Sequence, residues 1–192
     1  MGHAALWTAT EAAARAGDVD VVHAYYHPEV GAREGRLHRD RGEHLLHRAA
    51  RACHRRAPES AVRTHLIAQP VVPALLAQSH DADLLVTADR GSGGFTGLMV
   101  GSVSTALATR TDCPLLVLRT GSDNRPRQPR SGPIVMGLDD TGSGALLDTA
   151  ARRHAGMVVV GGGRSASEHH VRGSTRLELL KRAPCAVSVL HG

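Results

Sequence analysis

Glycine and serine residues between positions 84 and 104 form the stretch whose residue types are best suited to chemistry. A short apolar run at 84–87 leads into a glycine-rich stretch that closes with Gly101-Ser102. This pattern predicts a strand, a loop and a helix that begins at the pair, with Ser102 or Ser104 as its cap. Backbone N–H groups in the first turn of a helix have no intrahelical partner, and the helix dipole attracts negative charge. The stretch therefore predicts an anion site, which glycine lets a phosphate approach closely.

The same loop resembles the nucleotide loop of the universal stress protein family, whose pattern is Gly-x2-Gly-x9-Gly-Ser/Thr. Gly91 matches the second glycine, nine residues follow it, and Gly101-Ser102 matches the closing pair. The first glycine position holds Ala88, which adds a methyl group where backbone would meet ligand. The resemblance implies an ATP site in which backbone N–H groups and hydroxyls hold the phosphates. The residues assigned to that site are Ala88, Gly91, Gly101, Ser102, Val103, Ser104 and Asp139.

Alternating helix and strand patterns along residues 4–118 predict the fold class. Alanine-rich and apolar-periodic stretches predict helices, and short β-favouring runs between turn residues predict strands. Such alternation is typical of a doubly wound α/β layer, in which crossover helices cover a parallel sheet. The expected helices span 4–16, 37–56, 70–79 and the residues from 102 up to 112, and the expected strands span 19–25, 60–67, 84–87 and 115–118.

The family resemblance implies an adenine-nucleotide α-hydrolase-like universal stress fold with strand order 3-2-1-4-5. Family members open on a strand that ends in Val-Asp, whereas this sequence opens on a helical pattern at residues 4–16. The expected sheet therefore lacks its central strand. Two strand edges would then be left without backbone partners, which is costly in a protein interior.

Residues 133–192 repeat parts of the same unit. Pro133–Leu138 resembles the opening strand of the family and is followed by Asp139-Asp140, a pair that suits Mg²⁺ with ATP phosphates or, more often, caps the next helix. We expect residues 1–120 to form a universal-stress-like domain without its first strand, 121–132 a linker, and 133–192 an abbreviated second unit. The remaining expected elements are a helix at 144–153, a strand at 157–160, a helix from 173 to 182 and a strand at 186–190.

A second glycine loop lies in this repeat. A shift of 72 residues places Gly91 on Gly163, Gly101 on Gly173 and Ser102 on Ser174, whereas a shift of one more places Ala88 on Gly161. Both alignments remain open on the sequence alone. A possible second nucleotide site therefore comprises Gly161, Gly163, Gly173 and Ser174.

Two arrangements of the halves are compatible with the sequence. In the first, Pro133–Leu138 fills the central position of the first sheet and brings Asp139 beside the glycine loop. In the second, which we prefer, residues 133–192 build a three-stranded layer of their own. Its last strand, 186–190, would then pair antiparallel with 115–118, as paired domains of the family do. Alternatively, the same kind of pairing through terminal strands would join two chains in a homodimer.

Composition narrows the remaining functions. The chain has 192 residues and a net charge of +5, carried almost wholly by arginine, and only 2% aromatic residues. Few aromatics argue against a base-stacking surface, and the arginines are spread along the chain apart from 33–56, so we expect no nucleic-acid partner. No apolar run approaches a membrane span and no signal peptide is recognisable, so we expect a cytoplasmic protein without a membrane partner.

Metal and catalytic chemistry have weaker support. His44 and His47 lie three residues apart on an expected helix, near Cys53-His54, but zinc spacing for further ligands is missing, so no metal site is expected. No nucleophile elbow or Ser/His/Asp order stands out. The resemblance thus implies a stress-response protein that binds an adenine nucleotide, with at most slow ATP hydrolysis. The alternative is a structural or interaction protein with a vestigial pocket.

Overall fold

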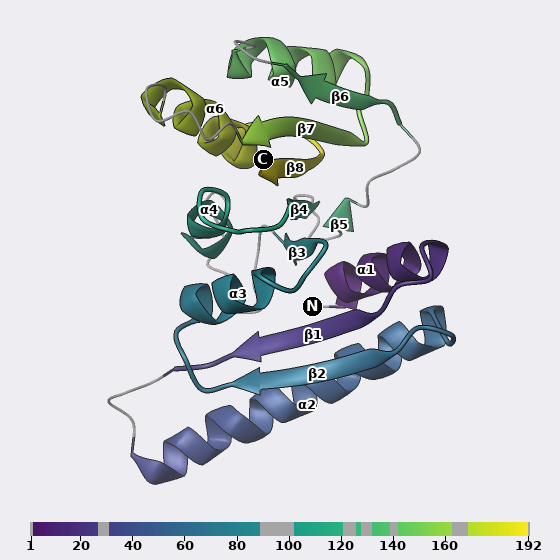
Figure 1. Cartoon of the computed structure of the whole chain (residues 1–192), viewed down its shortest axis with the longest axis vertical. Helices are drawn as coiled ribbons and strands as arrows, with labels where there is room; N and C mark the ends of the chain where they lie inside the picture. Colours follow the sequence, from purple (N-terminus) through teal and green to yellow (C-terminus); the bar gives the residue numbers. More distant parts are fainter. Residues whose placement is uncertain are drawn as a thin grey trace. The chain divides into compact units, whose positions relative to one another are not determined.

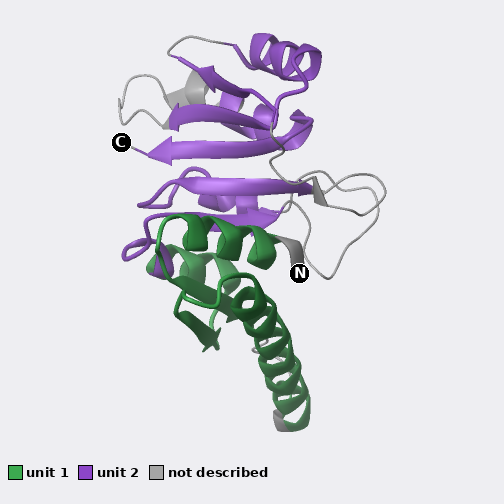
Figure 2. Ribbon diagram, turned by 90° about the vertical axis from the view of Figure 1, so that its right-hand side faces the viewer, with its two compact units in different colours: residues 1–77 green, residues 78–192 purple. Residues whose placement is uncertain are grey.

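The computed structural model describes residues 2–26, 31–88, 102–120, 126–127, 132–138, 142–162 and 169–191. These residues form two compact units, 1–77 and 78–192 (Figure 2). The unit boundary differs from the linker expected at 121–132. The physical reason is backbone pairing, because strands on both sides of that linker join one sheet in the second unit.

The first unit combines two parallel strands with two long helices (Figure 1). β1 and β2 pair from Val19 opposite Val62 to Ala24 opposite Ile67. Helices α1 and α2 share a small core, in which Ala9, Val19, Cys53 and Ala57 are all buried. The elements are α1 (Gly2–Ala14), β1 (Val19–Ala24), α2 (Ala32–Arg56) and β2 (Val62–Ile67), and α3 (Val71–Ser79) runs across the unit boundary.

The second unit is built on one six-stranded sheet. Its path is β3-β4-β8-β7-β6, and β5 pairs antiparallel with β4 away from that path. β4 and β8 supply the most deeply buried apolar side chains, including Leu115, Val117, Val187 and Val189. The elements are β3 (Leu85–Ala88), α4 (Ser102–Leu107), β4 (Leu115–Thr120), β5 (Pro126–Arg127), β6 (Ile134–Gly137), α5 (Ser143–Arg152), β7 (Met157–Gly162), α6 (His169–Arg182) and β8 (Ala186–His191).

The pairing of β4 with β8 confirms the preferred arrangement of the halves. These strands run antiparallel, with Leu116 opposite Ser188, while β6 pairs with β7 and β7 with β8 in parallel. β6 therefore does not occupy a position in the first sheet, and the arrangement that placed it there is wrong. The apolar character of β4 and β8 explains the result, because pairing buries both strands in one core.

The α/β fold class is also confirmed. With the first strand of the family absent, β1, β2, β3 and β4 correspond to strands 2, 3, 4 and 5 of the order 3-2-1-4-5, and both neighbouring pairs that this leaves, 3-2 and 4-5, are present and parallel. Within the described ranges, no strand pairs with the second edge of β1 or of β3. Among the same residues, no helix is long and apolar enough to cross a membrane.

Two helix starts were predicted too late. α2 begins at Ala32 rather than at 37, so one helix contains every arginine from Arg33 to Arg56. α6 begins at His169 rather than at Gly173. The residues added to α2 are charged apart from Ala32 and Gly35, and those added to α6 are polar apart from Val171. Neither stretch has the apolar periodicity that marks a helix start in a sequence.

Candidate functional site

The junction of β3 and α4 is the part of the predicted nucleotide loop that the structure describes. Ala88 ends β3, one residue after the predicted strand end at 87, and Ser102 begins α4, as predicted. The side chain of Ser104 is 2% exposed and connects these two elements. Its Oγ lies 3.4 Å from the carbonyl oxygen of Ala88 and 3.2 Å from Oγ1 of Thr87. The first turn of α4 is thereby fixed to the carboxyl end of β3.

This geometry separates the roles of the neighbouring serines. The Ser104 hydroxyl donates to the Ala88 carbonyl, so Thr87 is left to donate to Ser104, and the Ser104 hydroxyl is engaged within the protein. Ser102, by contrast, is exposed, and Val103 is half-buried. The N–H groups of this first turn have no partner inside the helix. Ser102 is thus the hydroxyl of the loop sequence that α4 presents to solvent.

Four predicted site residues lie outside the described residues. These are Gly91, Gly101, Asp139 and Gly163. For Gly101 and Asp139, the structure describes the residue next to each along the chain. Gly101 immediately precedes α4, and Asp139 comes directly after Leu138 at the end of the β6 segment.

The second glycine loop has a different frame. Gly161 lies in β7 and is exposed, with open space where a Cβ would be. Gly173 and Ser174 lie inside α6, because that helix begins at His169. The N–H groups of residues five and six of an α-helix bond to carbonyls four residues earlier. These two amides are therefore used by the helix, unlike those of the first turn of α4.

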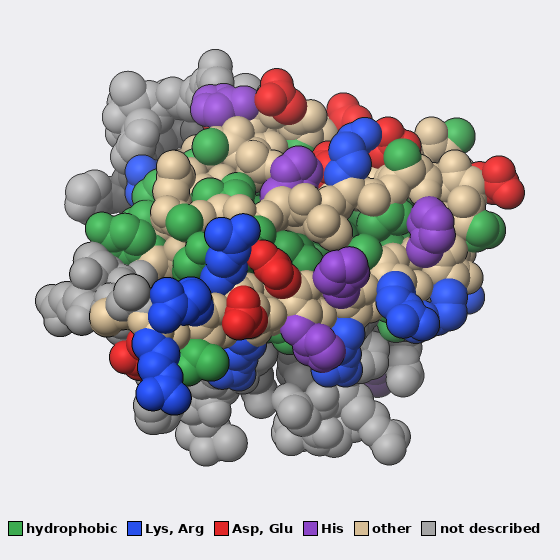
Figure 3. Space-filling view, turned by 90° about the horizontal axis from the view of Figure 1, so that it is seen from below, with side chains coloured by type: hydrophobic (Ala, Val, Ile, Leu, Met, Phe, Trp, Pro, Cys, Tyr) green, Lys and Arg blue, Asp and Glu red, His purple; other side chains and the backbone are tan. Residues whose placement is uncertain are grey.

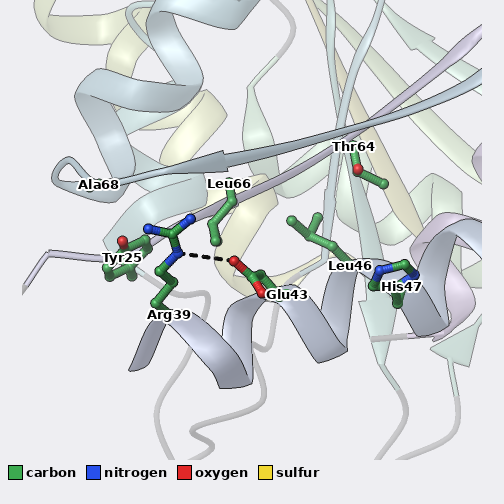
Figure 4. A pocket seen from close by; sticks show the side chains of 8 residues that line it. All are labelled: Tyr25, Arg39, Glu43, Leu46, His47, Thr64, Leu66 and Ala68. Carbon is green, nitrogen blue, oxygen red and sulfur yellow. Dashed lines mark hydrogen bonds and ion pairs between the residues drawn. The ribbon is translucent and has the colours of Figure 1, made fainter. Parts of the chain in front are cut away.

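An unpredicted hollow of about 380 Å³ lies between α2 and the β1–β2 sheet (Figure 4). Leu46 is 6% exposed and belongs to its apolar part, while the phenol of Tyr25 contributes to its polar part. Arg39 Nε donates to Glu43 Oε1 over 3.0 Å, so the two charges at this wall compensate each other. The complete lining is Tyr25, Arg39, Glu43, Leu46, His47, Thr64, Leu66 and Ala68.

Sequence reasoning missed this hollow because its lining comes from three elements. Tyr25 and Ala68 directly follow the carboxyl ends of β1 and β2, which was the available signal. The α2 residues lack any motif spacing. Among the described residues, which include His44, His47 and His54, no three His, Cys, Asp or Glu side chains lie close enough together to hold a metal ion.

Comparisons with known proteins agree with this fold. The model of the universal stress protein family matches residues 1–119. Universal stress protein Rv2623 of Mycobacterium tuberculosis is 30% identical over 170 residues, covering 80% of this chain and 57% of the relative. Universal stress protein Rv2624c of the same organism is 29% identical over 165 residues, covering 83% of this chain and 60% of the relative. The chain thus spans less than two thirds of the length of these relatives.

Solved structures give the same answer for the fold. A universal stress protein from Archaeoglobus fulgidus superposes with a TM-score of 0.73 at 12% identity, covering 98% of this chain and 91% of that one. The functionally unknown protein PA1789 from Pseudomonas aeruginosa superposes with a TM-score of 0.61 at 11% identity, covering 96% of this chain and 85% of that one.

Proposed function

The chain belongs to the universal stress protein family, and from this premise we propose that it acts in a stress response by binding ATP at the β3–α4 loop. The observation that carries the proposal is the fixed start of α4. Ser104 ties the first turn of this helix to the carboxyl end of β3, where ligands bind in open α/β sheets. The exposed Ser102 hydroxyl and the amides of that turn supply donors suited to a phosphate.

The proposed roles follow from residue type and position. Gly101, Ser102 and Val103 hold phosphate oxygens through backbone N–H groups, and Ser102 adds its hydroxyl. Ser104 contributes its amide only and acts as a positioning residue, because its hydroxyl is engaged with Ala88. Asp139 accepts a hydrogen bond from the adenine or ribose, from the same chain or from a second copy. Mg²⁺ accompanies the nucleotide as the partner of phosphate oxygens.

We further propose that binding, not turnover, is the functional event. Phosphoryl transfer requires a positioned base or a cationic side chain at the transferred group, and the spacing of the sequence picks out neither. Hydrolysis would therefore be slow. The protein would act in the cytoplasm through nucleotide-dependent conformation or contacts, with residues 1–120 and 133–192 as the two family-like units and a homodimer as the form between chains.

Equilibrium binding of a labelled ATP analogue to the full chain tests this proposal. We expect saturable binding that Gly101→Ala and Ser102→Ala weaken at least tenfold, since each removes a close approach or a donor. Thr109→Ala is the matched control, because it removes an exposed hydroxyl that bonds to the Ala106 carbonyl at the end of α4. A thermal shift with ATP, ADP and AMP gives a second readout, because a ligand that binds the folded state stabilises it.

The alternative function is a structural or interaction protein with a vestigial pocket. Ala88 at the first glycine position and the engaged hydroxyl of Ser104 favour it, because both reduce what the loop offers a phosphate. A melting temperature unchanged by all three nucleotides at millimolar concentration would decide for this alternative. Binding that Ser102→Ala and Thr109→Ala leave equally intact would also remove the loop from the proposal.

A further inference from the structure

The positive charge of the chain is concentrated in one helix. α2 contains eight arginines against three acidic residues, Glu34, Asp40 and Glu43, which gives a formal charge of +5. The whole chain also carries +5, so all other residues together are neutral. Among the other helices of the described residues, α6 has the most arginines and lysines, with four, which is half the number in α2. A general bias toward arginine would spread the net charge over the chain, whereas here the net charge lies in α2 and gives the protein one positively charged surface.

The fold directs this charge toward solvent. The apolar side of α2 is already covered in the first unit, where Leu46 is 6% exposed and Cys53 is fully buried. On the opposite side, Arg48, Arg51 and Arg55 are all exposed and follow each other at spacings of three and four residues. Side chains at these spacings lie on the same face of a helix. We call Arg48, Arg51 and Arg55, with the exposed histidines His44, His47 and His54, the basic face of α2.

Carboxylates are missing from this face. Between His44 and Arg56, α2 contains no Asp or Glu. Glu43, the residue directly before His44, is paired with Arg39. Within the described ranges, no carboxylate pairs with Arg48, Arg51 or Arg55, whereas Arg15, Arg63, Arg152 and Arg182 all have such partners. Figure 3, seen from the side on which α2 lies in Figure 1, shows arginine or lysine and histidine side chains spread over this surface, with some carboxylates among them.

We propose that the basic face of α2 binds the phosphate backbone of a nucleic-acid duplex without reading its sequence. Arginine guanidinium groups bind phosphate oxygens in a bidentate manner and are always charged. The thirteen residues from His44 to Arg56 extend about 20 Å along the helix. That length corresponds to roughly six base-pair steps of a duplex, at about 3.4 Å per step. A rigid helix thus aligns three guanidinium groups with successive phosphates.

A membrane surface fits this helix less well. Amphipathic helices bind lipid by inserting their apolar face. The apolar face of α2 is occupied by β1, β2 and α1, and Leu37 is the one large apolar side chain of this helix that is strongly exposed, at 62%. The sequence alone argued against nucleic acid because its arginines, apart from those at 33–56, are spread along the chain and its aromatics are few. Phosphate contacts need no aromatics, and the helix brings the arginines onto one face.

Fluorescence anisotropy with the full chain and a labelled duplex of about 20 base pairs tests the proposal over salt concentrations from about 50 to 200 mM. We expect saturable binding that weakens steeply with salt. The triple variant Arg48→Gln, Arg51→Gln, Arg55→Gln should bind at least tenfold more weakly. The slope of log K against log salt should fall by about 2 to 3, because each lost phosphate contact contributes about 0.9. Glutamine retains a high helix propensity, and an unchanged circular dichroism spectrum and melting temperature establish that the variant is folded.

The matched control removes the same charge from the second unit, through Arg110→Gln, Arg153→Gln and Lys181→Gln, all at exposed positions. It should bind the duplex within about twofold of the unchanged chain if the face and not the net charge decides. Equal losses in the two triple variants would overturn the proposal, as would the absence of duplex binding at the lowest salt concentration. Binding to phosphatidylserine vesicles that requires Arg48, Arg51 and Arg55, without duplex binding, would assign the face to a lipid surface instead. None of these outcomes depends on ATP, so the proposed nucleotide site is tested separately.

Discussion

The hydroxyl oxygen of Ser104 lies 3.2 Å from that of Thr87, which places the first turn of α4 against the carboxyl end of β3. Ser104 is 2% exposed, so water cannot replace this partner. A buried hydroxyl that loses its partner retains its desolvation cost, which makes such a contact asymmetric in energy. The contact therefore governs the stability of the junction more than it offers chemistry to a ligand.

Ser104→Ala should lower the free energy of unfolding by about 1 to 3 kcal/mol, because it leaves both the Thr87 hydroxyl and the Ala88 carbonyl without this partner. Urea unfolding measures the loss. Thr87→Val should cost less than Ser104→Ala, since Ser104 keeps its bond to Ala88. The double variant should lose less stability than the sum of the losses in the two single variants. A loss equal to that sum would show that the two hydroxyls are not coupled.

Replacing either of two glycines of α2 with alanine should change the free energy of unfolding by different amounts. Gly35 has open space where a Cβ would be, so Gly35→Ala should stabilise the protein by about 0.5 to 1 kcal/mol through helix propensity. At Gly42, a Cβ would lie 2.7 Å from Leu66 Cδ1 and 2.8 Å from His23 Cδ2. Gly42→Ala gains the same propensity but crowds these side chains, so it should be less stable than Gly35→Ala by about 1 to 3 kcal/mol.

Thermal or urea unfolding of the two variants, measured in parallel, checks this difference. Because both substitutions fall in one helix and change one methyl group, differences in the unfolded chain largely cancel. Equal stabilities would mean that α2 does not approach β1 and β2 as closely at Gly42 as the structure has it.

Much of the fold could be predicted from the sequence because it depends on local patterns. Apolar runs at 115–118 and 186–190 identified β4 and β8, and the family resemblance supplied the antiparallel pairing that the structure confirms. The start of α4 at Ser102 was equally readable from its glycine and serine residues. These features combine a recognisable residue type with a fixed spacing, which is what single-sequence reasoning detects.

Other features depend on contacts that the sequence does not encode locally. The role of Ser104 follows from a contact with residues 16 and 17 positions away, and a serine near a glycine loop looks the same whether its hydroxyl is engaged or exposed. The arginines of the basic face already lay in the helix expected at 37–56, but their exposure depends on which side of α2 packs against β1, β2 and α1, and no local pattern states that. The hollow beside Tyr25 joins three elements and left no motif.

Asp20 provides a prediction about acid pH. The Arg63 side chain, which hydrogen-bonds to its carboxylate, lowers the pKa of Asp20 below its ordinary value of 3.8, with burial opposing the effect and His65 adding to it. A carboxylate with a lowered pKa stabilises the folded state at neutral pH, and this stabilisation is lost as the pH falls through that lowered pKa. Asp20→Asn should therefore destabilise the protein at pH 7 but not at acid pH below the pKa.

The magnitude should be small, less than about 1 kcal/mol, because the Asp20 and Arg63 side chains are 43% and 55% exposed and solvent screens their attraction. Urea unfolding at neutral and at acid pH, each compared with the unchanged chain, measures it. Asp81→Asn is the control, since among the described residues Asp81 has no ion-pair partner. A loss that persists undiminished at acid pH would assign the effect to packing rather than to charge.

The three cysteines should react slowly with thiol reagents in the folded protein. Cys53 is fully buried and Cys113 and Cys185 are each 5% exposed. Burial raises the pKa of the Cys53 and Cys113 thiols, which reduces the reactive thiolate, and Cys53 Sγ also donates to the carbonyl of Ala5 over 3.4 Å.

Labelling with a chromogenic disulfide reagent should thus modify all three thiols at least 100-fold faster in denaturant than in buffer, because modification of the folded chain requires local opening. Thr109→Cys supplies the internal standard, since position 109 is exposed and its thiol should react at once. If one of the three thiols of the unchanged chain reacted as fast as this added thiol, the core around that thiol would open far more readily than its burial implies. That core lies at α1 and α2 for Cys53 and at β3 and β8 for the other two cysteines.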